Sequence, residues 1–331
     1  MNDKIAGALY GMALGDAMGM PAELWGRKRA KAYFGRIEGF LDGPAENDVA
    51  FNYKKGQFTD DTGQALVLLD SIESTDFKPD VRDIAARMLA WAEREHAFEN
   101  NILGPTSKVA LANFRDGIED SRITDKALSN GSAMRIAPIG CLFAPDRKAD
   151  LARYVYEVSR ATHTSDVTIA GAAMIAQAVS SAMVKDDFDE IIQDVLEIEE
   201  IGYELGCETF SPRLGERVKI GLDIAGRYAD DEEGFIRRIY DVVGTGVGII
   251  ESVPAAISVA YYAKDPNRSC LLCVNMAGDT DTIGAMATAI CGAYTGYGRI
   301  HPDTIDTLNR QNDVDFARYI SILEKGREKL A

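Results

Sequence analysis

No charged side chain occurs from Thr282 to Gly298 (TIGAMATAICGAYTGYG), a stretch that begins within the acidic tetrad Asp279-Thr280-Asp281-Thr282. A helix that is apolar on every side is buried in a protein interior, so the tetrad at its start is expected to be buried too. An earlier tetrad, Thr59-Asp60-Asp61-Thr62, leads in the same way into the apolar residues 65–69. The fold must therefore hold several carboxylates at the inner ends of two core helices.

Two interpretations of the tetrads are open at this point. Thr59, Asp60, Thr280 and Asp281 could be simple N-caps, because the free N–H groups and the dipole of a helix N-terminus favour such residues. A cap needs only one of them, whereas each tetrad has four Asp or Thr residues in a row. If the two ends converge, carboxylates within about 4–6 Å of each other repel unless cations lie between them. Oxygen ligands without nearby Cys or His favour Mg²⁺ or Mn²⁺ over zinc, so we predict a site for these cations.

The charge of the chain excludes several partners. A formal net charge of −16 and a pI of about 4.7 argue against binding to nucleic acid or to an anionic membrane. Asp16 interrupts the hydrophobic N-terminal run, and no segment has the length of a transmembrane helix, so a cytoplasmic location is expected. The five cysteines fit a reducing compartment, and the lone Cys270-x-x-Cys273 has no second pair that would indicate zinc.

Helical periodicity dominates the chain, and strand-like alternation is nearly absent. The pattern predicts an all-α protein with helices at about 3–18, 62–73, 79–96, 104–116, 134–142, 148–161, 166–184, 187–203, 213–228, 232–242, 250–263, 267–276, 281–295 and 314–328. No long Pro, Gly or Ser linker interrupts it. Because the two tetrads must meet, we expect residues 1–331 to form a single domain.

Glycine recurs every four residues at Gly7, Gly11, Gly15 and Gly19. This spacing lines one side of the first helix with bare backbone, which favours close packing of another helix over a direct ligand role. Asp16 and Glu23 accompany this glycine stripe. Each is interpreted as a cap, a salt-bridge partner or a group directed toward a cavity.

Three further segments carry polar residues in ligand-binding patterns. Gly104-Pro105-Thr106-Ser107 should start a helix whose N–H groups suit a phosphate or hydroxyl, although a structural cap is the simpler interpretation. Ser129-Asn130-Gly131-Ser132 combines small residues with hydrogen-bonding side chains, as an ordinary turn also would. Thr162-His163-Thr164-Ser165-Asp166 precedes an apolar helix, and His163 is equally compatible with a ligand contact and a structural role. Arg135 is interpreted as an interior ion-pair partner in preference to an anion contact.

Several enzyme classes leave no signature in the chain. It contains no G-x-S-x-G elbow, P-loop, dinucleotide-binding fingerprint or HExxH motif. Serine hydrolysis and nucleoside-triphosphate chemistry therefore lose support.

The ordered motifs closely resemble the ADP-ribosylglycohydrolase family, which includes dinitrogenase reductase-activating glycohydrolase and hydrolases of ADP-ribosyl-arginine and ADP-ribosyl-serine. The resemblance spans residues 5 to about 296. It rests on GALYGMALGDAMGMPAE, FTDDTGQAL, LGPTSKVAL, NGSAMR, the TH pair, ESVPAAI and NMAGDTDTIGAMATAICGA. It implies a compact, orthogonal multi-helix fold with two divalent cations, Mg²⁺ or Mn²⁺, at the base of a cleft.

The resemblance also implies roles for individual residues. The family's metal ligands match Thr59, Asp60, Asp61, Asp279, Asp281 and Thr282. Glu23 matches a glutamate that lies at the metal centre or gates the cleft in some members, so the general base is expected among Asp60, Asp61 and Glu23. Substrate contacts are implied for Gly104, Thr106, Ser107, Asn130, Gly131, Ser132 and His163.

The implied activity is hydrolysis of a ribosyl C1 N- or O-glycosidic bond in an ADP-ribosylated acceptor or ADP-ribose-like compound, either small or protein-linked. Two departures from the family pattern, Ser129 in the G-N-G motif and Ala277 in the G-G-D-T-D motif, bear on the pocket shape. The rival functions are a small-molecule nucleoside hydrolase, a two-metal phosphoesterase and an inactive ADP-ribose-binding relative. The sequence fixes neither the leaving group nor the choice of Mg²⁺ or Mn²⁺ nor the oligomeric state.

Overall fold

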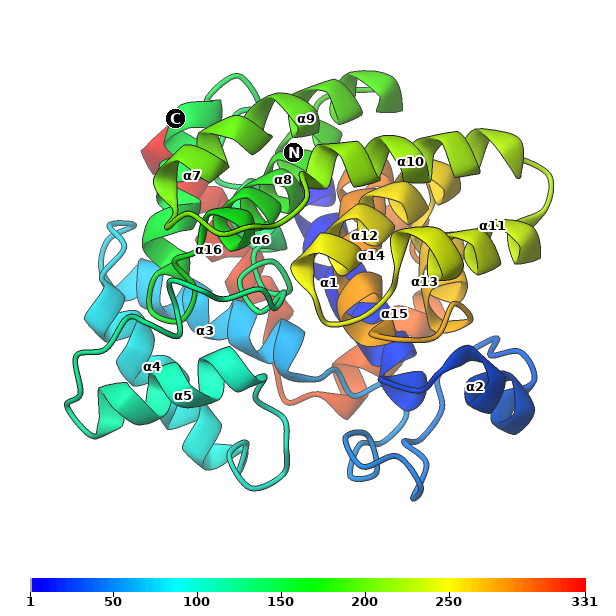
Figure 1. Cartoon of the computed structure of the whole chain (residues 1–331), viewed down its shortest axis with the longest axis horizontal. Helices are drawn as coiled ribbons and strands as arrows, with labels where there is room; N and C mark the ends of the chain where they lie inside the picture. Colours follow the sequence, from blue (N-terminus) through cyan, green and yellow to red (C-terminus); the bar gives the residue numbers. More distant parts are fainter. Residues whose placement is uncertain (1) are drawn as a thin grey trace.

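The structure, a computed structural model, describes residues 2–331 and is built from α-helices (Figure 1). In this part of the chain, β structure is confined to three isolated bridges, which confirms the predicted all-α class. The helices are α1 Asn2–Gly19, α2 Arg27–Phe34, α3 Asp60–Ser74, α4 Val81–Arg94, α5 Pro105–Arg115, α6 Ala137–Gly140, α7 Lys148–Ser159, α8 Asp166–Ala182, α9 Phe188–Leu205, α10 Leu214–Arg227, α11 Glu232–Arg238, α12 Ile249–Ala263, α13 Pro266–Val274, α14 Thr280–Thr295, α15 Pro302–Gln311 and α16 Phe316–Leu330. Short 3₁₀ turns at Met20–Ala22 and Tyr297–Arg299 and a π-helical turn at Ile239–Val243 complete the set.

The first helix packs directly on α14, the helix that begins at the second tetrad (Figure 1). A Cβ atom added to Gly15 would lie only 2.0 Å from the carbonyl oxygen of Gly284, and one added to Gly284 would lie 2.4 Å from the carbonyl oxygen of Gly15. Backbones this close leave no room for a side chain on either helix. The glycine stripe therefore has the packing role that its spacing predicts, and it brings α1 alongside the second tetrad.

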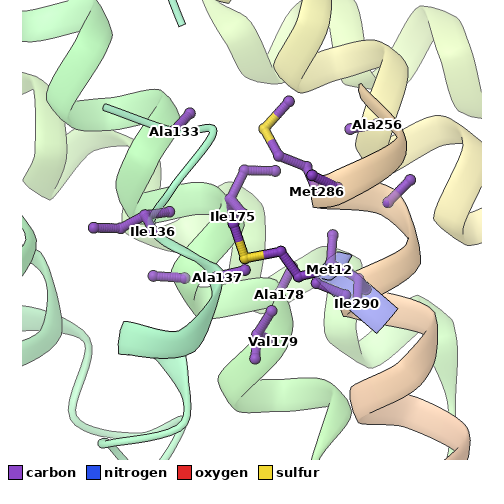
Figure 2. Packing of buried hydrophobic residues seen from close by; sticks show 14 of the residues in the cluster. Met12, Ala133, Ile136, Ala137, Ile175, Ala178, Val179, Ala256, Met286 and Ile290 are labelled. Atoms are coloured by element: carbon purple, nitrogen blue, oxygen red, sulfur yellow. The ribbon is translucent and has the colours of Figure 1, made fainter. Parts of the chain in front are cut away.

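The apolar helices form the core of the molecule. Figure 2 shows Met12 of α1 and Ile290 of α14 beside Ala178 and Val179 of α8, with Ala137 of α6 close by. All of these side chains are buried. Because α1, α8 and α14 are apolar nearly all round, they have to be enclosed by other helices.

Amphipathic helices such as α4, α9 and α10 cover this core. Helices α3, α4 and α5 lie together to one side of α1 and α14 (Figure 1). None of the described helices combines the length and the hydrophobicity that crossing a bilayer requires.

Helices α2 and α15 were not expected from the sequence. Helix α2 (RKRAKAYF) buries no residue, so it carries no apolar period that would have indicated it. Helix α15 buries only Ile305 and Leu308. The helix expected over 134–142 shortens to Ala137–Gly140, because turns occupy the residues on either side.

Candidate metal centre

The two tetrads meet in the interior of the protein. The Thr282 hydroxyl donates to both carboxylate oxygens of Asp61 at 3.2 Å, which joins the first turns of α14 and α3. The hydroxyl of Thr59 lies 3.5 Å from Oδ2 of Asp281. The convergence predicted from the sequence is therefore present in the fold.

Two overlapping groups of carboxylates could each hold a metal ion. One oxygen each from Asp16, Asp61 and Asp281 lie within 4.8 Å of one another, and so do oxygens of Glu23, Asp279 and Asp281. The four aspartates are buried, whereas Glu23 is partly exposed. Asp281 belongs to both groups.

Asp16 of α1 was left out of the predicted ligand set. Its Oδ1 accepts from the backbone N–H and the hydroxyl of Thr59, both at 2.8 Å. Its Oδ2 accepts from the backbone N–H and the hydroxyl of Thr62, at 2.9 and 2.6 Å. Asp16 therefore caps α3 from another helix, as one of its sequence interpretations proposed, and the same carboxylate borders the acidic cluster.

The tetrads themselves do not act as caps. Thr59 and Asp279 occupy the N-cap positions of α3 and α14, yet neither side chain bonds to the first-turn N–H groups of its helix. The hydroxyl of Thr280 donates instead to the carbonyl of Gly19 at 2.7 Å. Because Asp16 supplies the cap of α3, the tetrad carboxylates there stay available for other ligands.

Burial and mutual repulsion disfavour the charged forms of these carboxylates. Burial, followed by the charges of Asp16 and Asp279, raises the pKa of Asp60 to about 8. Burial raises the pKa of Asp279 to about 6, against the lowering effect of a hydrogen bond from Asn130. Burial and neighbouring carboxylates also raise the pKa values of Asp61, Asp281 and Glu23 well above normal. Cations bound between these groups would relieve the repulsion.

The donor set fits hard divalent cations. Oδ1 of Asp281 is fully buried and has no hydrogen-bond partner among the described residues. A buried oxygen of this kind is costly unless a ligand satisfies it. Carboxylate and hydroxyl oxygens are the ligands that Mg²⁺ and Mn²⁺ prefer, so these residues suit the predicted pair of cations.

Asn130 joins the second predicted ligand-binding segment to the carboxylates. Its side-chain amide donates to Oδ2 of Asp279 at 2.6 Å and to the hydroxyl of Ser252 at 3.1 Å. Ser252 lies in the ESVPAAI motif but was not singled out from the sequence. The backbone N–H of Asn130 donates to the carbonyl of Val247, which fixes the turn.

The three predicted ligand-binding segments also meet one another. Nε2 of His163 lies 3.1 Å from the hydroxyl of Ser129, which lies 3.2 Å from the hydroxyl of Thr106. A Cβ atom added to Gly131 would lie 2.7 Å from the His163 ring and 3.5 Å from the hydroxyl of Ser107. Only glycine leaves this space open.

Gly104 is the N-cap residue of α5, and Pro105 follows at the first helical position. Pro105 has no N–H, so the first-turn donors of α5 are the N–H groups of Thr106 and Ser107. This helix start lies where the sequence placed it, beside Ser129 and His163.

Two predictions for this region need correction. The hydroxyl of Ser132 is fully buried and donates to the carbonyl of Thr168 at 2.9 Å, so it faces the core and not a ligand. Within residues 2–331, Arg135 is not paired with a carboxylate, because its guanidinium donates to the uncharged side chains of Gln64 and Thr162. Gln64 in turn donates to Asp60 at 2.9 Å, a contact that the sequence analysis missed.

Comparison with known proteins gives one consistent result. The profile of the ADP-ribosylglycohydrolase family matches residues 1–329. The uncharacterized protein YegU of Escherichia coli K12 is 45% identical, over 99% of this chain and 98% of its own length. The ADP-ribosylhydrolase ARH3 of Danio rerio is 26% identical, over 91% and 85%. A solved structure of an ADP-ribosylglycohydrolase-related protein complex is 23% identical, with a TM-score of 0.72 and coverage of 100% and 99%.

Proposed function

Because the chain belongs to the ADP-ribosylglycohydrolase family and is a glycosidase of that type, we propose that it hydrolyses a ribosyl C1 N- or O-glycosidic bond in an ADP-ribosylated acceptor or ADP-ribose-like compound. One contact carries this proposal, the 2.6 Å hydrogen bond from Asn130 to Asp279. It joins the turn that borders Thr106 and His163 to the acidic cluster. A ribose would then bind at the carboxylates, and the phosphates attached to that ribose would bind at a neighbouring site.

Two divalent cations, Mg²⁺ or Mn²⁺, are proposed as cofactors. Thr59, Asp60, Asp61, Asp279, Asp281 and Thr282 would hold them, and the positions of Asp16 and Glu23 support adding these two carboxylates. When bound, such cations supply Lewis-acid stabilisation and orient the ribose hydroxyls. The unpartnered Oδ1 of Asp281 is the strongest support for this set.

The proton acceptor for water is proposed to be Asp60 or Glu23. Both are partly accessible, whereas Asp61 is 1% exposed and both its oxygens are bonded by Thr282. A general base has to reach the water that it deprotonates. A carboxylate at this place also stabilises the positive charge that develops on the ribose when the C1 bond breaks.

The phosphates are proposed to lie at the start of α5. The first-turn N–H groups of Thr106 and Ser107 provide the donors, and the helix dipole favours an anion there. The N–H of Lys108 is already bonded to the carbonyl of Gly104. His163 is fully buried, so we propose that it acts on this part of the ligand site through Ser129, whose hydroxyl lies 3.1 Å from its Nε2.

A second candidate function, hydrolysis of a small N-riboside such as a nucleoside, is favoured by a cavity next to Thr59. The cavity has a volume of about 690 Å³, which suits a small ligand. Its walls include Tyr53 and Trp91 together with the amide side chains of Asn52 and Asn100. Aromatic rings and amides are the side chains that bind planar bases.

A substrate panel tests both functions. ADP-ribosyl-arginine, ADP-ribosyl-serine, O-acetyl-ADP-ribose and simple nucleosides are incubated with Mg²⁺ or Mn²⁺, and the products are separated by chromatography. Release of ADP-ribose supports the first function, and release of free base from nucleosides supports the second. If no ribosyl bond is cleaved with either metal, both proposals fail and an inactive binding relative becomes the better description.

We also propose that residues 1–331 form one domain and that the protein is cytoplasmic. The contact between α1 and α14 ties the beginning of the chain to its last quarter, which supports one domain. All five cysteines lie in the described residues and are free thiols, which supports a reducing compartment.

A further inference from the structure

Arg135 lies at the centre of a buried chain of hydrogen bonds that begins at Asp60. Its side chain is 1% exposed. Nη1 donates to Oε1 of Gln64 at 2.7 Å, and Nη2 donates to the hydroxyl of Thr162 at 2.6 Å. The chain continues to Asp60 on one side and to His163 on the other. We call these two branches the Asp60 arm and the His163 arm.

The guanidinium of Arg135 fixes which groups donate and which accept along the Asp60 arm. Arginine can only donate hydrogen bonds, so the atom of Gln64 that faces it must be the carbonyl oxygen. A flipped amide would place two donors against each other. The NH₂ group of Gln64 therefore faces Asp60 and donates to its Oδ2 at 2.9 Å.

The direction of the His163 arm follows in the same way. The hydroxyl of Thr162 accepts from Arg135 and has a single proton of its own. Its only other side-chain partner in the described structure is Nδ1 of His163 at 2.8 Å. If Nδ1 donated instead, the buried hydroxyl proton of Thr162 would have no acceptor, which is costly, so Thr162 is assigned as the donor to Nδ1. A neutral imidazole then carries its proton on Nε2.

Burial and the nearby Arg135 charge lower the pKa of His163 well below its normal value, which supports a neutral ring. Nε2 faces the hydroxyl of Ser129 at 3.1 Å, in the turn next to Asn130. The protonated nitrogen is thus directed toward the segments that the proposed phosphate site uses.

We infer that Arg135 is a positioning residue that sets the direction of both arms, so that Gln64 presents an N–H donor to Asp60 and His163 presents its Nε2 proton to the substrate side. The fork of the guanidinium suits this role because its two terminal nitrogens point to different partners. Nε of Arg135 is buried and has no hydrogen-bond partner among the described residues.

The inferred tautomer is tested by nitrogen NMR, which requires no activity. The chain has only three histidines, at 96, 163 and 301, so each ring can be assigned from its own substitution to Gln. Two-bond proton–nitrogen spectra of the full chain at pH 7 should show His163 neutral and protonated on Nε2. A ring protonated on Nδ1, or doubly protonated, would overturn the inference.

Thr162→Val keeps the side-chain shape and removes the donor to Nδ1. We expect the His163 signals to move toward a mixture of tautomers. Thr164→Val is the matched control, because that hydroxyl donates to Asp125 at 2.7 Å and lies outside both arms. Identical His163 spectra in Thr162→Val and the unsubstituted protein would contradict the proposed direction.

Arg135→Lys tests whether Arg135 sets the hydrogen-bond direction of both arms. Lysine keeps the positive charge but lacks the two terminal nitrogens that donate to different partners. We expect a change in the His163 tautomer together with at least a fivefold loss of Mn²⁺ affinity in calorimetry. Gln64→Met should weaken Mn²⁺ binding without changing the His163 tautomer. Thr162→Val should change the His163 tautomer without weakening Mn²⁺ binding. If Arg135→Lys lowers only the melting temperature, Arg135 is a structural residue and the inference is wrong. These readouts do not depend on substrate, so they stay decisive even if the proposed reaction is incorrect.

Discussion

Both the backbone N–H and the hydroxyl of Thr62 donate to Oδ2 of Asp16, at 2.9 and 2.6 Å. The two residues are 46 positions apart, and Thr59 bonds the other oxygen in the same way. A carboxylate on α1 therefore fixes the position of the first turn of α3. That turn carries Asp60 and Asp61, so this contact sets where the first half of the candidate metal centre lies.

Asp16→Ala is expected to lower the free energy of unfolding by about 2–5 kcal/mol, because it leaves buried N–H groups at the start of α3 without acceptors. Urea denaturation followed by circular dichroism measures the change. Asp80→Ala is the matched control: Asp80 caps α4 within its own exposed turn, and its loss should cost about 1 kcal/mol. Equal losses of unfolding free energy in the two variants would show that the cap from α1 to α3 stabilises the protein no more than an ordinary local cap.

Gly15→Ala is expected to destabilise the protein by more than about 3 kcal/mol or to prevent folding, because the new Cβ would lie 2.0 Å from the carbonyl oxygen of Gly284. Gly226→Ala is the control, since no atom of the described residues lies within 4 Å of a Cβ at that exposed helical position. That change should stabilise α10 by about 0.5–1 kcal/mol. Soluble expression and urea midpoints report both effects. A well-folded Gly15→Ala protein would contradict the packing described for α1 and α14.

Asp281→Ala is expected to abolish the rise in melting temperature caused by Mn²⁺ or Mg²⁺ and to abolish hydrolysis, while the helical circular dichroism stays. Asp60→Ala should likewise lose hydrolysis. A cation at 100 times its Kd stabilises the native state by about 2.7 kcal/mol, which thermal denaturation detects easily. Thr280→Val is the control, because that hydroxyl bonds to Gly19. Full metal response in Asp281→Ala would refute the proposed ligand set.

The metal-free protein is expected to lose stability as the pH rises from about 5 to 8. Burial and neighbouring charges raise the pKa of Asp60 to about 8, and burial raises that of Asp279 to about 6, whereas unfolded aspartates titrate near 3.9. Between these values the folded chain holds protons that the unfolded chain has released, so a rising pH favours unfolding.

Urea denaturation in a chelator at pH 6 and pH 8 measures this dependence. Saturating Mg²⁺ should reduce the difference in the free energy of unfolding between pH 6 and pH 8, because cations favour the ionised carboxylates. Greater stability at pH 8 than at pH 6 in the chelator would show that the carboxylates are not held in the repulsive arrangement described.

The sequence by itself determined the features that depend only on nearby residues in the chain, namely most of the helices and the positions of the motifs on them. Apolar periodicity predicts most of the helices, because burying one face is a local requirement. The tetrads sit at the starts of α3 and α14 as predicted, and the stripe at Gly7 to Gly19 predicts a close helix contact. The order of the motifs indicates the family, which comparison confirms.

Only the tertiary structure decided which groups meet. Asp16 could have been a cap, an ion-pair partner or a cavity residue, and the fold makes it a cap for Thr59 and Thr62. Arg135 was expected to pair with a carboxylate, and it bonds to Gln64 and Thr162 instead. Each of these contacts joins residues that are far apart in the chain. The physical reason is that helix propensity and periodicity act over a few residues, whereas hydrogen-bond partners in the core are selected by how whole helices pack.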